Sequence, residues 1–263
     1  MGRLIRSTFI VILIATLIVV GFQLYKEFEK YWSAYNQTET IRKEVGRDKK
    51  TVKHKKLLKQ NKDYIGWLYC PKTVIDYPMV KSHDNKDYLH TGFKGTYVWA
   101  GTLFADCRTE KPFVDMNTII YGHHMMDGSM FHDLDKWKEK KYRKKHNRFY
   151  IYTPKKNYVI KIVNVITVPQ DDAIYDVPYI SDEEITNFLK KVGKGTENDR
   201  FVTLSTCGYS FDGARTLVIG TLEGTHKKIE EIEIRKEQKT KWEVFLMMMK
   251  ELIHNSLTEE PTA

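Results

Sequence analysis

The segment that decides the fold reads Arg200-Phe-Val-Thr-Leu-Ser-Thr-Cys207-Gly-Tyr-Ser-Phe-Asp-Gly-Ala-Arg215-Thr-Leu-Val-Ile-Gly220. Two β-rich runs flank a short polar stretch with two glycines, and this pattern predicts a strand, a loop and a second strand. Cys207 ends the first strand and Arg215 opens the second. Functional side chains are often held at the ends of strands, where a rigid sheet positions them. A thiol that faces a fixed guanidinium at such a place is a candidate nucleophile. The alternative is that Cys207 is a buried small hydrophobe and Arg215 a solvated charge.

A second segment supplies a base for this thiol. It reads Asn117-Thr-Ile-Ile-Tyr121-Gly-His123-His124-Met-Met-Asp127-Gly128-Ser-Met-Phe131, a β-branched run that ends in Tyr-Gly-His and breaks into a turn. This strand end, the Thr-Leu-Ser-Thr-Cys strand end, and an arginine eight residues after the cysteine together resemble the sortases. Sortases are the cysteine transpeptidases of Gram-positive cell envelopes. The resemblance extends from Asp63 to Glu223.

The resemblance implies three catalytic residues. Cys207 would be the nucleophile, His123 the general acid and base, and Arg215 the donor that holds the oxyanion or a substrate carbonyl. A free cysteine has a pKa of about 8.5 and is mostly protonated at neutral pH. A nearby histidine and arginine would lower this pKa and favour the thiolate. In the sortases, activity is attributed to the fraction that carries a thiolate and an imidazolium together.

Two adjacent histidines compete for the role of base. The resemblance places the base directly after the glycine, which selects His123. Consecutive strand residues point to opposite faces of a sheet, so only one of the two can face the thiol. His124 is then expected to be exposed or to support the site from behind.

Six further residues match, through the resemblance, positions that line the substrate groove of class B sortases. They are Asn85 and Leu89 on a predicted helical turn, Tyr121 two residues before the histidine, Ser205 two before the cysteine, and Tyr179 and Ile180 just before a predicted helix. Each of the six could equally be a core or capping residue.

The remaining pattern predicts a mainly β fold with helices, because short strands outnumber helices. A hairpin is expected from Arg148 to Val168, followed by a helix from Ser181 to Val192 with Ser181 and Glu184 as its capping box. The resemblance implies a closed sortase-like β-barrel of about eight strands over residues 63–224. The helix inserted before the catalytic strand is the feature that indicates class B.

The N-terminal region predicts a membrane anchor. The 19 residues from Ser7 to Tyr25 carry no charge and are numerous enough to cross a bilayer. Arg3 and Arg6 precede them, which favours a cytoplasmic N-terminus and an extracellular remainder. A cleaved signal peptide is the alternative, although no small-x-small cleavage site follows. We expect residues 1–25 to be a cytoplasmic tip and a single transmembrane helix, and residues 26–62 to be helical linker.

Residues 225–263 depart from the family pattern, in which the last strand usually lies close to the terminus. The first part, from Lys227 to Arg235, is strongly charged. Five later residues mark one face of a helix: Trp242, Phe245, Leu246, Met249 and Ile253. This extension is expected to be helical and to pack on the domain, on the N-terminal helices or on a partner.

The charge balance indicates an anionic partner surface. Lys and Arg number 43 against 34 acidic residues, which gives a formal net charge of +9. Such a protein is attracted to lipid head groups or wall polymers. Nucleic acid is the rival partner, but the sequence has no nucleic-acid-binding motif and no aromatic stacking pattern.

The sequence predicts neither a metal nor a cofactor. No His/Cys cluster has zinc spacing, and no acidic loop fits the calcium pattern. Cys70 and Cys107 bring the cysteine count to three, and we expect free thiols, although a disulfide between them is the alternative.

These features predict a membrane-anchored class B sortase. Such an enzyme cleaves a C-terminal sorting signal of exported proteins after Thr and transfers the chain to an amine of the peptidoglycan cross-bridge or its precursor. The signals of this class resemble Asn-Pro-x-Thr-Asn or a Pro-x-Thr-Gly variant. The alternatives are a pilus-type sortase with a pilin lysine as acceptor, a hydrolytic cysteine protease, and a non-enzymatic envelope scaffold. The combination of Cys, His and Arg argues against the scaffold.

Overall fold

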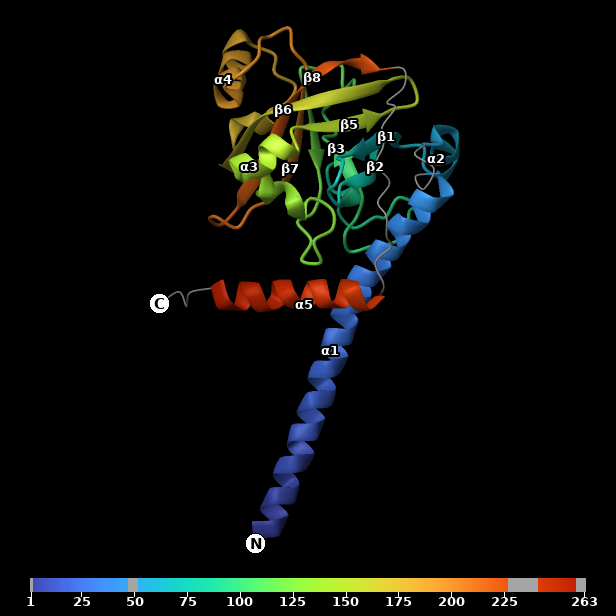
Figure 1. The fold of residues 1–263 in the computed structure, drawn as a ribbon, viewed down its shortest axis with the longest axis vertical. Helices are drawn as coiled ribbons and strands as arrows, with labels where there is room; N and C mark the ends of the chain where they lie inside the picture. Colours follow the sequence, from blue (N-terminus) through green and yellow to red (C-terminus); the bar gives the residue numbers. More distant parts are fainter. Residues whose placement is uncertain (1, 47–51, 227–240, 259–263) are drawn as a thin grey trace.

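The computed structural model describes residues 2–46, 52–226 and 241–258 (Figure 1). Within these ranges, eight strands close into a barrel in the order β1-β2-β3-β4-β7-β8-β6-β5. The strands are β1 Tyr64–Tyr69, β2 Asp76–Val80, β3 Leu103–Ala105, β4 Asn117–Tyr121, β5 Arg148–Tyr152, β6 Asn157–Pro169, β7 Phe201–Cys207 and β8 Ala214–His226. Closure removes the exposed edges that an open sheet would leave. The predicted closed barrel is therefore confirmed.

Two strand pairs in the barrel are parallel and the others are antiparallel. The parallel pairs are β2 with β3 and β4 with β7. A parallel pair needs a long crossover connection, and the chain between β4 and β7 supplies it with a helical segment, the β5–β6 hairpin and a further helix. Consequently two strand ends that lie far apart in the sequence meet at one edge of the barrel.

The barrel interior is filled by aliphatic and aromatic side chains. Leu68, Met79, Ile120, Leu204 and Val218 all belong to one buried cluster. A smaller cluster lies on the outer face of β7 and β8, where α4 (Asp182–Val192) covers the sheet through Phe188 and Val192. These two layers fix β7 from both sides.

The start and end of α4 agree with the sequence. The Ser181 side chain accepts a hydrogen bond from the backbone N–H of Glu184, and the Glu184 carboxylate accepts one from the backbone N–H of Ser181 at 3.0 Å. Gly193 ends the helix in the left-handed region with φ 72°. This confirms the predicted capping box.

The segment after the Tyr-Gly-His motif becomes helical only from His132. The chain forms a 3-10 helix, η3, over His132–Lys138, which is followed by α3, Lys140–Lys145. The preceding residues form a turn, because the Asp127 carboxylate accepts hydrogen bonds from the backbone N–H and hydroxyl of Ser129. Met130 then has φ 53°, which a helix cannot contain.

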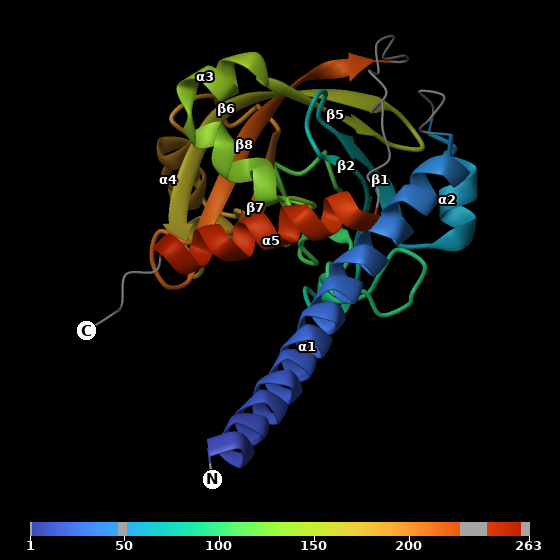
Figure 2. The ribbon, with the colours of Figure 1, turned by 60° about the horizontal axis from the view of Figure 1, so that its bottom comes forward.

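The N-terminal part of the chain forms one long helix, α1, Gly2–Glu44, followed by α2, His54–Gln60. Of the helices in the described ranges, α1 is the one with the length and apolar composition to cross a membrane. Its N-terminal half projects away from the barrel in Figures 1 and 2, whereas its second half packs on the barrel through Tyr31, Tyr35 and Ile41. The linker helix is therefore also part of the folded domain.

A final helix, α5, spans Lys241–Thr258 and runs across α1 beneath the barrel (Figures 1 and 2). The Phe245 ring meets the Phe28 ring of α1 edge to face, with 5.5 Å between centroids. Val244 and Met248 are buried in the same cluster as the barrel interior. The charged segment from Lys227 to Arg235 lies outside the described residues.

Candidate active site

The strand register brings the two motifs together. Tyr121 of β4 lies opposite Ser205 of β7 in their parallel pairing. His123 and Cys207 each follow two residues later, so both lie at the same edge of the barrel. The Thr206 hydroxyl donates to the Gly122 carbonyl at 2.8 Å and ties the two strand ends together.

The glycine of the Tyr-Gly-His motif is required by close packing. A Cβ atom on Gly122 would lie 2.4 Å from a methyl group of Leu103 and 2.7 Å from the Phe131 ring. Any side chain at this position would push the strand end, and His123 with it, away from β7.

Side-chain alternation places the site on the outer face of the barrel. Val202 and Leu204 point inward and are buried, whereas Ser205 and Cys207 lie on the opposite face of β7. A cavity of about 390 Å³ opens there. Its lining residues are Asn85, Leu89, Thr102, Phe104, Arg108, Tyr121, Gly122, His123, Gln170, Tyr175, Ser205, Thr206, Cys207 and Arg215. Thus seven of the nine residues singled out from the sequence line one cavity.

Cys207 is the exposed cysteine among the three in the sequence. Cys70 is buried, and burial raises the pKa of its thiol to about 12. Cys107 is half-buried, and its backbone N–H donates to the Asn85 carboxamide at 2.8 Å. All three are free thiols, as expected for Cys70 and Cys107. A cysteine acts as a nucleophile only where its thiolate can form and a substrate can reach it. Of the three cysteines, Cys207 is the one that is exposed.

The His123 ring is held in one orientation. Its Nε2 atom lies 2.8 Å from the Leu89 carbonyl oxygen. A carbonyl only accepts, so Nε2 carries a hydrogen and Nδ1 is the atom that gains or loses a proton. The ring also stacks on His90 at 5.4 Å between centroids. Burial lowers the pKa of His123; the Leu89 hydrogen bond partly opposes this, and the neighbouring His90 adds to the lowering.

Arg215 is held beside Cys207 by the strand ladder, in which the two residues are direct partners. One guanidinium nitrogen donates to the Ala214 carbonyl at 2.9 Å, and the other terminal nitrogen donates to the Gln170 side chain at 3.1 Å. The group is thus oriented by its own strand and by the segment after β6.

A buried carboxylate lies behind the cavity wall. Asp106 is fully buried and accepts hydrogen bonds from Tyr121 at 2.8 Å, Asn85 at 3.2 Å and Arg108 at 2.8 Å. Burial favours its neutral form, but the hydrogen bonds from Arg108 and Tyr121 outweigh this effect and lower the pKa of Asp106. Burial, together with the Asp106 charge, raises the pKa of Tyr121 well above its usual range. Asp106 therefore fixes three residues that line the cavity.

His124 does not line the cavity. Its side chain is largely buried, and its Nε2 lies 3.2 Å from the Asp135 carboxylate. The other oxygen of Asp135 accepts from the Thr216 hydroxyl at 2.8 Å, one residue after Arg215. His124 thus supports β8 from the opposite side, in agreement with the choice of His123.

Comparisons with known proteins identify the family. A family model described as the sortase domain matches residues 68–223. Sortase B from Listeria monocytogenes is 33% identical over 232 residues, which cover 79% of this chain and 94% of that protein. The chain belongs to the class B sortases. This confirms the family predicted from the two sequence motifs. Class B sortases are cysteine transpeptidases.

Solved structures agree with this assignment. A Staphylococcus aureus sortase B–substrate complex aligns with a TM-score of 0.60 at 25% identity, over 75% of this chain and 93% of that one. A class B sortase from Streptococcus pyogenes that is involved in pilus biogenesis aligns with a TM-score of 0.58 at 33% identity, over 65% and 98% of the two chains.

Two of the residues expected to line the substrate groove do not line this cavity. The Tyr179 hydroxyl donates to the Ile174 carbonyl at 2.7 Å, and its ring stacks on Phe188 of α4. Ile180 directly precedes the N-cap of α4 and is 84% exposed. Neither residue lines the cavity, because the tyrosine anchors α4 and the isoleucine points into solvent.

Tyr175 occupies the wall position instead. It ends the 3-10 helix η4, Ala173–Tyr175, and its hydroxyl lies 2.8 Å from the Ser205 hydroxyl. The Arg108 guanidinium donates to its carbonyl at 2.6 Å. Sequence reasoning missed Tyr175 and Arg108, because neither sits in a recognisable motif. The nearest signal was the Asp172 cap, which accepts from the Ile174 N–H and starts the η4 turn.

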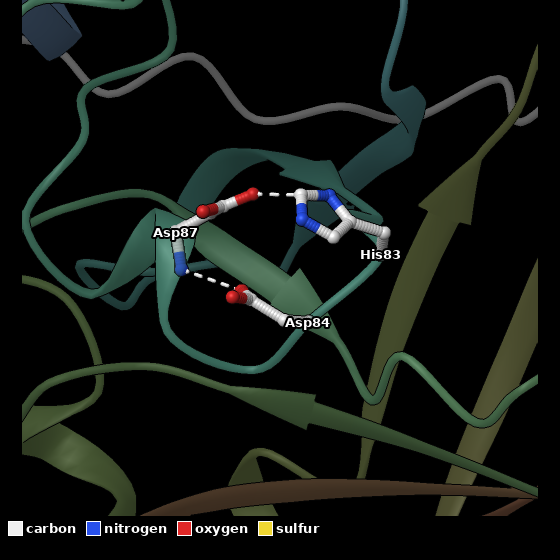
Figure 3. A group of neighbouring side chains, drawn as sticks. All are labelled: His83, Asp84 and Asp87. Atoms are coloured by element: carbon white, nitrogen blue, oxygen red, sulfur yellow. Dashed lines mark hydrogen bonds and ion pairs between the residues drawn. The ribbon is translucent and has the colours of Figure 1, made fainter.

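A separate cluster of possible metal ligands lies on the turn before η2, Asp87–Leu89 (Figure 3). Asp84 accepts hydrogen bonds from the backbone N–H groups of Lys86 and Asp87, both at 2.8 Å. His83 Nδ1 lies 3.4 Å from the Asp87 carboxylate. These contacts cap the turn that carries Asn85 and Leu89 into the cavity.

Proposed function

We propose that this class B sortase is a membrane-anchored transpeptidase in which Cys207 is the nucleophile, His123 the general acid and base, and Arg215 the oxyanion donor. The observation that carries the proposal is that all three side chains line one cavity, with the exposed thiol at its edge. The same cavity contains Asn85, Leu89, Tyr121 and Ser205, which we propose as substrate contacts.

The first step forms a thioacyl enzyme. The Cys207 thiolate attacks the carbonyl carbon of the substrate threonine, and the negative charge on the carbonyl oxygen is stabilised by the planar donors of Arg215. The peptide C–N bond then breaks, and protonated His123 gives a proton to the leaving amine. The products are a thioester on Cys207, a free amine and a neutral imidazole.

The second step resolves the thioester. An acceptor amine attacks the thioacyl carbon and gives its surplus proton to the neutral His123, and the Cys207 thiolate leaves. This restores the thiolate and the imidazolium and forms one amide bond for the one that was broken. Burial lowers the pKa of His123, which favours the neutral base that the second step needs and reduces the fraction of imidazolium available for the first step.

We further propose that the substrate is a C-terminal sorting signal of the Asn-Pro-x-Thr-Asn or Pro-x-Thr-Gly type. A cavity of about 390 Å³ suits a short peptide segment rather than a folded partner. The acceptor is an amine of the peptidoglycan cross-bridge or its precursor. The Staphylococcus aureus sortase B–substrate complex, which has a similar fold, supports a substrate-binding role for this chain.

Helix α1 supports a proposal for where the protein lies in the cell. We propose that residues 1–25 anchor the chain as a cytoplasmic tip and membrane span, and that residues 26–62 connect this anchor to a catalytic barrel at residues 63–224. The catalytic domain then lies outside the cell, where exported proteins and wall amines meet. Arg3 and Arg6 before the span support this orientation.

A second candidate is a pilus-type sortase, in which a lysine of a pilin subunit is the acceptor. The observation that favours it is the likeness to the Streptococcus pyogenes enzyme involved in pilus biogenesis. The chemistry on Cys207 is the same in both cases, and only the acceptor differs.

The test is a peptide panel read by mass spectrometry. Full-length protein in lipid nanodiscs is incubated with peptides that carry each signal, with triglycine, with a lysine-containing pilin-type peptide, or with no amine. Cleavage after Thr with a ligated product, absent in Cys207→Ala, supports the proposal, and the preferred amine separates the two acceptors. Cleavage to a free threonine acid at the same rate with and without amines would instead indicate a hydrolase.

A further inference from the structure

Helix α5 has apolar residues on two faces, which is unusual for a helix at a protein surface. Val244 and Met248 are buried against the barrel core. Trp242 and Leu246 point elsewhere and are 66% and 45% exposed. Ile253 continues this spacing seven residues after Leu246 and is 54% exposed, whereas Met249 packs against the core cluster. A helix whose outer face met only water would carry polar residues at these positions.

The position of α5 relative to α1 suggests what this outer face meets. Phe245 contacts Phe28, three residues beyond Tyr25, where the uncharged segment of α1 ends. At 1.5 Å per residue, this contact lies about 4.5 Å past the end of the span. In both Figure 1 and Figure 2, α5 runs across α1 on the side of the barrel from which the apolar half of α1 projects. A helix placed in this way would lie along the surface of a bilayer that α1 crosses.

The residues around this junction are those that membrane interfaces favour. Lys26 is exposed one residue after the span, and Lys250 is exposed on α5 beside the apolar stripe. Lys30 lies over the Trp99 ring at 5.2 Å, which brings a half-exposed tryptophan from the barrel to the same level of α1. Tryptophan rings prefer the head-group region, and lysines nearby attract anionic lipid.

We propose that α5, the α1 turn at Phe28 and the Trp99 loop form a membrane-docking surface. The outer stripe of α5, Trp242, Leu246 and Ile253, inserts into the head-group and upper acyl region of the bilayer that α1 crosses. The ligand is thus the lipid surface itself. This inference depends on the membrane span proposed for α1, but not on the transpeptidase chemistry.

The docking surface is connected to the candidate active site. The end of the Met247 side chain lies 2.9 Å from where a Cβ on Gly128 would be, in the loop that follows His123. The Trp99 ring stacks on His90 at 4.8 Å, and His90 stacks on His123. Docking would therefore hold the cavity at a fixed height above the lipid.

The test measures the depth of nitroxide labels in full-length protein in nanodiscs that contain phosphatidylglycerol and phosphatidylcholine. The parent carries Cys107→Ser and Cys207→Ala, and Cys70 is left in place because it is buried. Single labels are attached at Leu246→Cys, at Leu13→Cys within the proposed span, and at Ile180→Cys, which is 84% exposed. Thermal melting of each labelled protein against the parent checks that the fold is intact.

We expect the label at position 246 to collide more often with oxygen than with a water-soluble nickel chelate, as the label at position 13 does. The label at position 180 should show the reverse. A 246 label that behaves like the 180 label would overturn the inference. Spectral broadening at position 246 that disappears on dilution with unlabelled chain would also overturn it, because a second copy would then be the partner. If the label at position 13 shows no contact with lipid, the proposed membrane span of α1 is wrong, and the docking inference fails with it. The transpeptidase proposal is tested separately, by peptide cleavage with the unmodified protein.

Discussion

Cys207 and Arg215 are direct partners in the β7–β8 ladder, although seven residues separate them in the sequence. The last residue of one strand therefore faces the second residue of the next, and the thiol and the guanidinium share one edge of the barrel. The backbone ladder, rather than a side-chain contact, sets their spacing.

Replacing Arg215 by lysine should slow the reaction strongly. Lysine keeps the charge but lacks the planar pair of donors, and loss of a preorganised oxyanion donor typically costs about 10²–10³ in rate. The measurement is kcat and KM for peptide cleavage. The matched control is Gln170→Ala, which removes only the side-chain acceptor at 3.1 Å and should have a much smaller effect. Arg215→Lys with near-normal kcat would contradict the oxyanion role.

Replacing His90 by alanine should raise the pKa of His123. Burial and the neighbouring His90 both lower that pKa, and the substitution weakens both effects. The folded-state value should then move toward the ordinary value of about 6.5. NMR titration of the His123 ring protons gives the value directly. His90→Phe keeps a stacked ring and should give a smaller rise, and an unchanged or lower pKa in His90→Ala would refute the argument.

Replacing Asp106 by asparagine should destabilise the fold and loosen the cavity wall. Asparagine keeps one acceptor oxygen but replaces the other by an NH2 donor and removes the charge, so donors of Asn85, Arg108 or Tyr121 lose a buried acceptor. A buried group left without a partner costs about 1–3 kcal/mol. Urea unfolding monitored by fluorescence provides the measurement. Thr109→Ala, a buried residue three positions along, serves as a control for simple truncation nearby.

The contribution of Asp106 should also depend on pH in one direction. Its pKa is lower in the folded state than in the unfolded state, where an aspartate has a pKa of about 3.9. The stabilisation is therefore complete above that value and is lost as the pH falls toward the folded-state pKa. The difference between the parent and Asp106→Asn should shrink in acid, and a difference that grows below pH of about 4 would contradict the assignment.

Tyr175 and Ser205 should act as a unit in substrate binding. Tyr175→Phe and Ser205→Ala each remove the same hydroxyl–hydroxyl bond, so the double variant should lose little more than either single variant. KM for the peptide is the readout. Ile180→Ser, in contrast, should leave KM unchanged, because Ile180 lies in solvent outside the cavity. Fully additive losses, or a raised KM in Ile180→Ser, would place the groove wall elsewhere.

Much of the site could be predicted because its chemistry lies in two short strand-end motifs. The alternating pattern of β4 and β7 can be read from short stretches of sequence. It is enough to predict which face of the sheet carries Tyr121, His123, Ser205 and Cys207. The capping box of α4 is equally local. Such signals need no knowledge of long-range contacts.

The remaining features depend on long-range packing. Tyr175 and Tyr179 are four residues apart in a segment without regular periodicity, and which of them faces the cavity is decided by η4 and by the stacking of Tyr179 on Phe188. The packing of α5 on α1 likewise depends on contacts between the two ends of the chain. The sequence predicted that these helices exist, but it left open what they pack against.

Intact-mass spectrometry can detect a thioacyl intermediate on Cys207. Full-length protein in nanodiscs is mixed with a peptide that it cleaves, without an acceptor amine, and is then quenched in acid. We expect a mass increase equal to the peptide up to and including its threonine. The adduct should be located on Cys207, released by hydroxylamine and absent in Cys207→Ala. Cleavage of the same peptide with no adduct under rapid quenching, or with the adduct on another residue, would contradict this prediction.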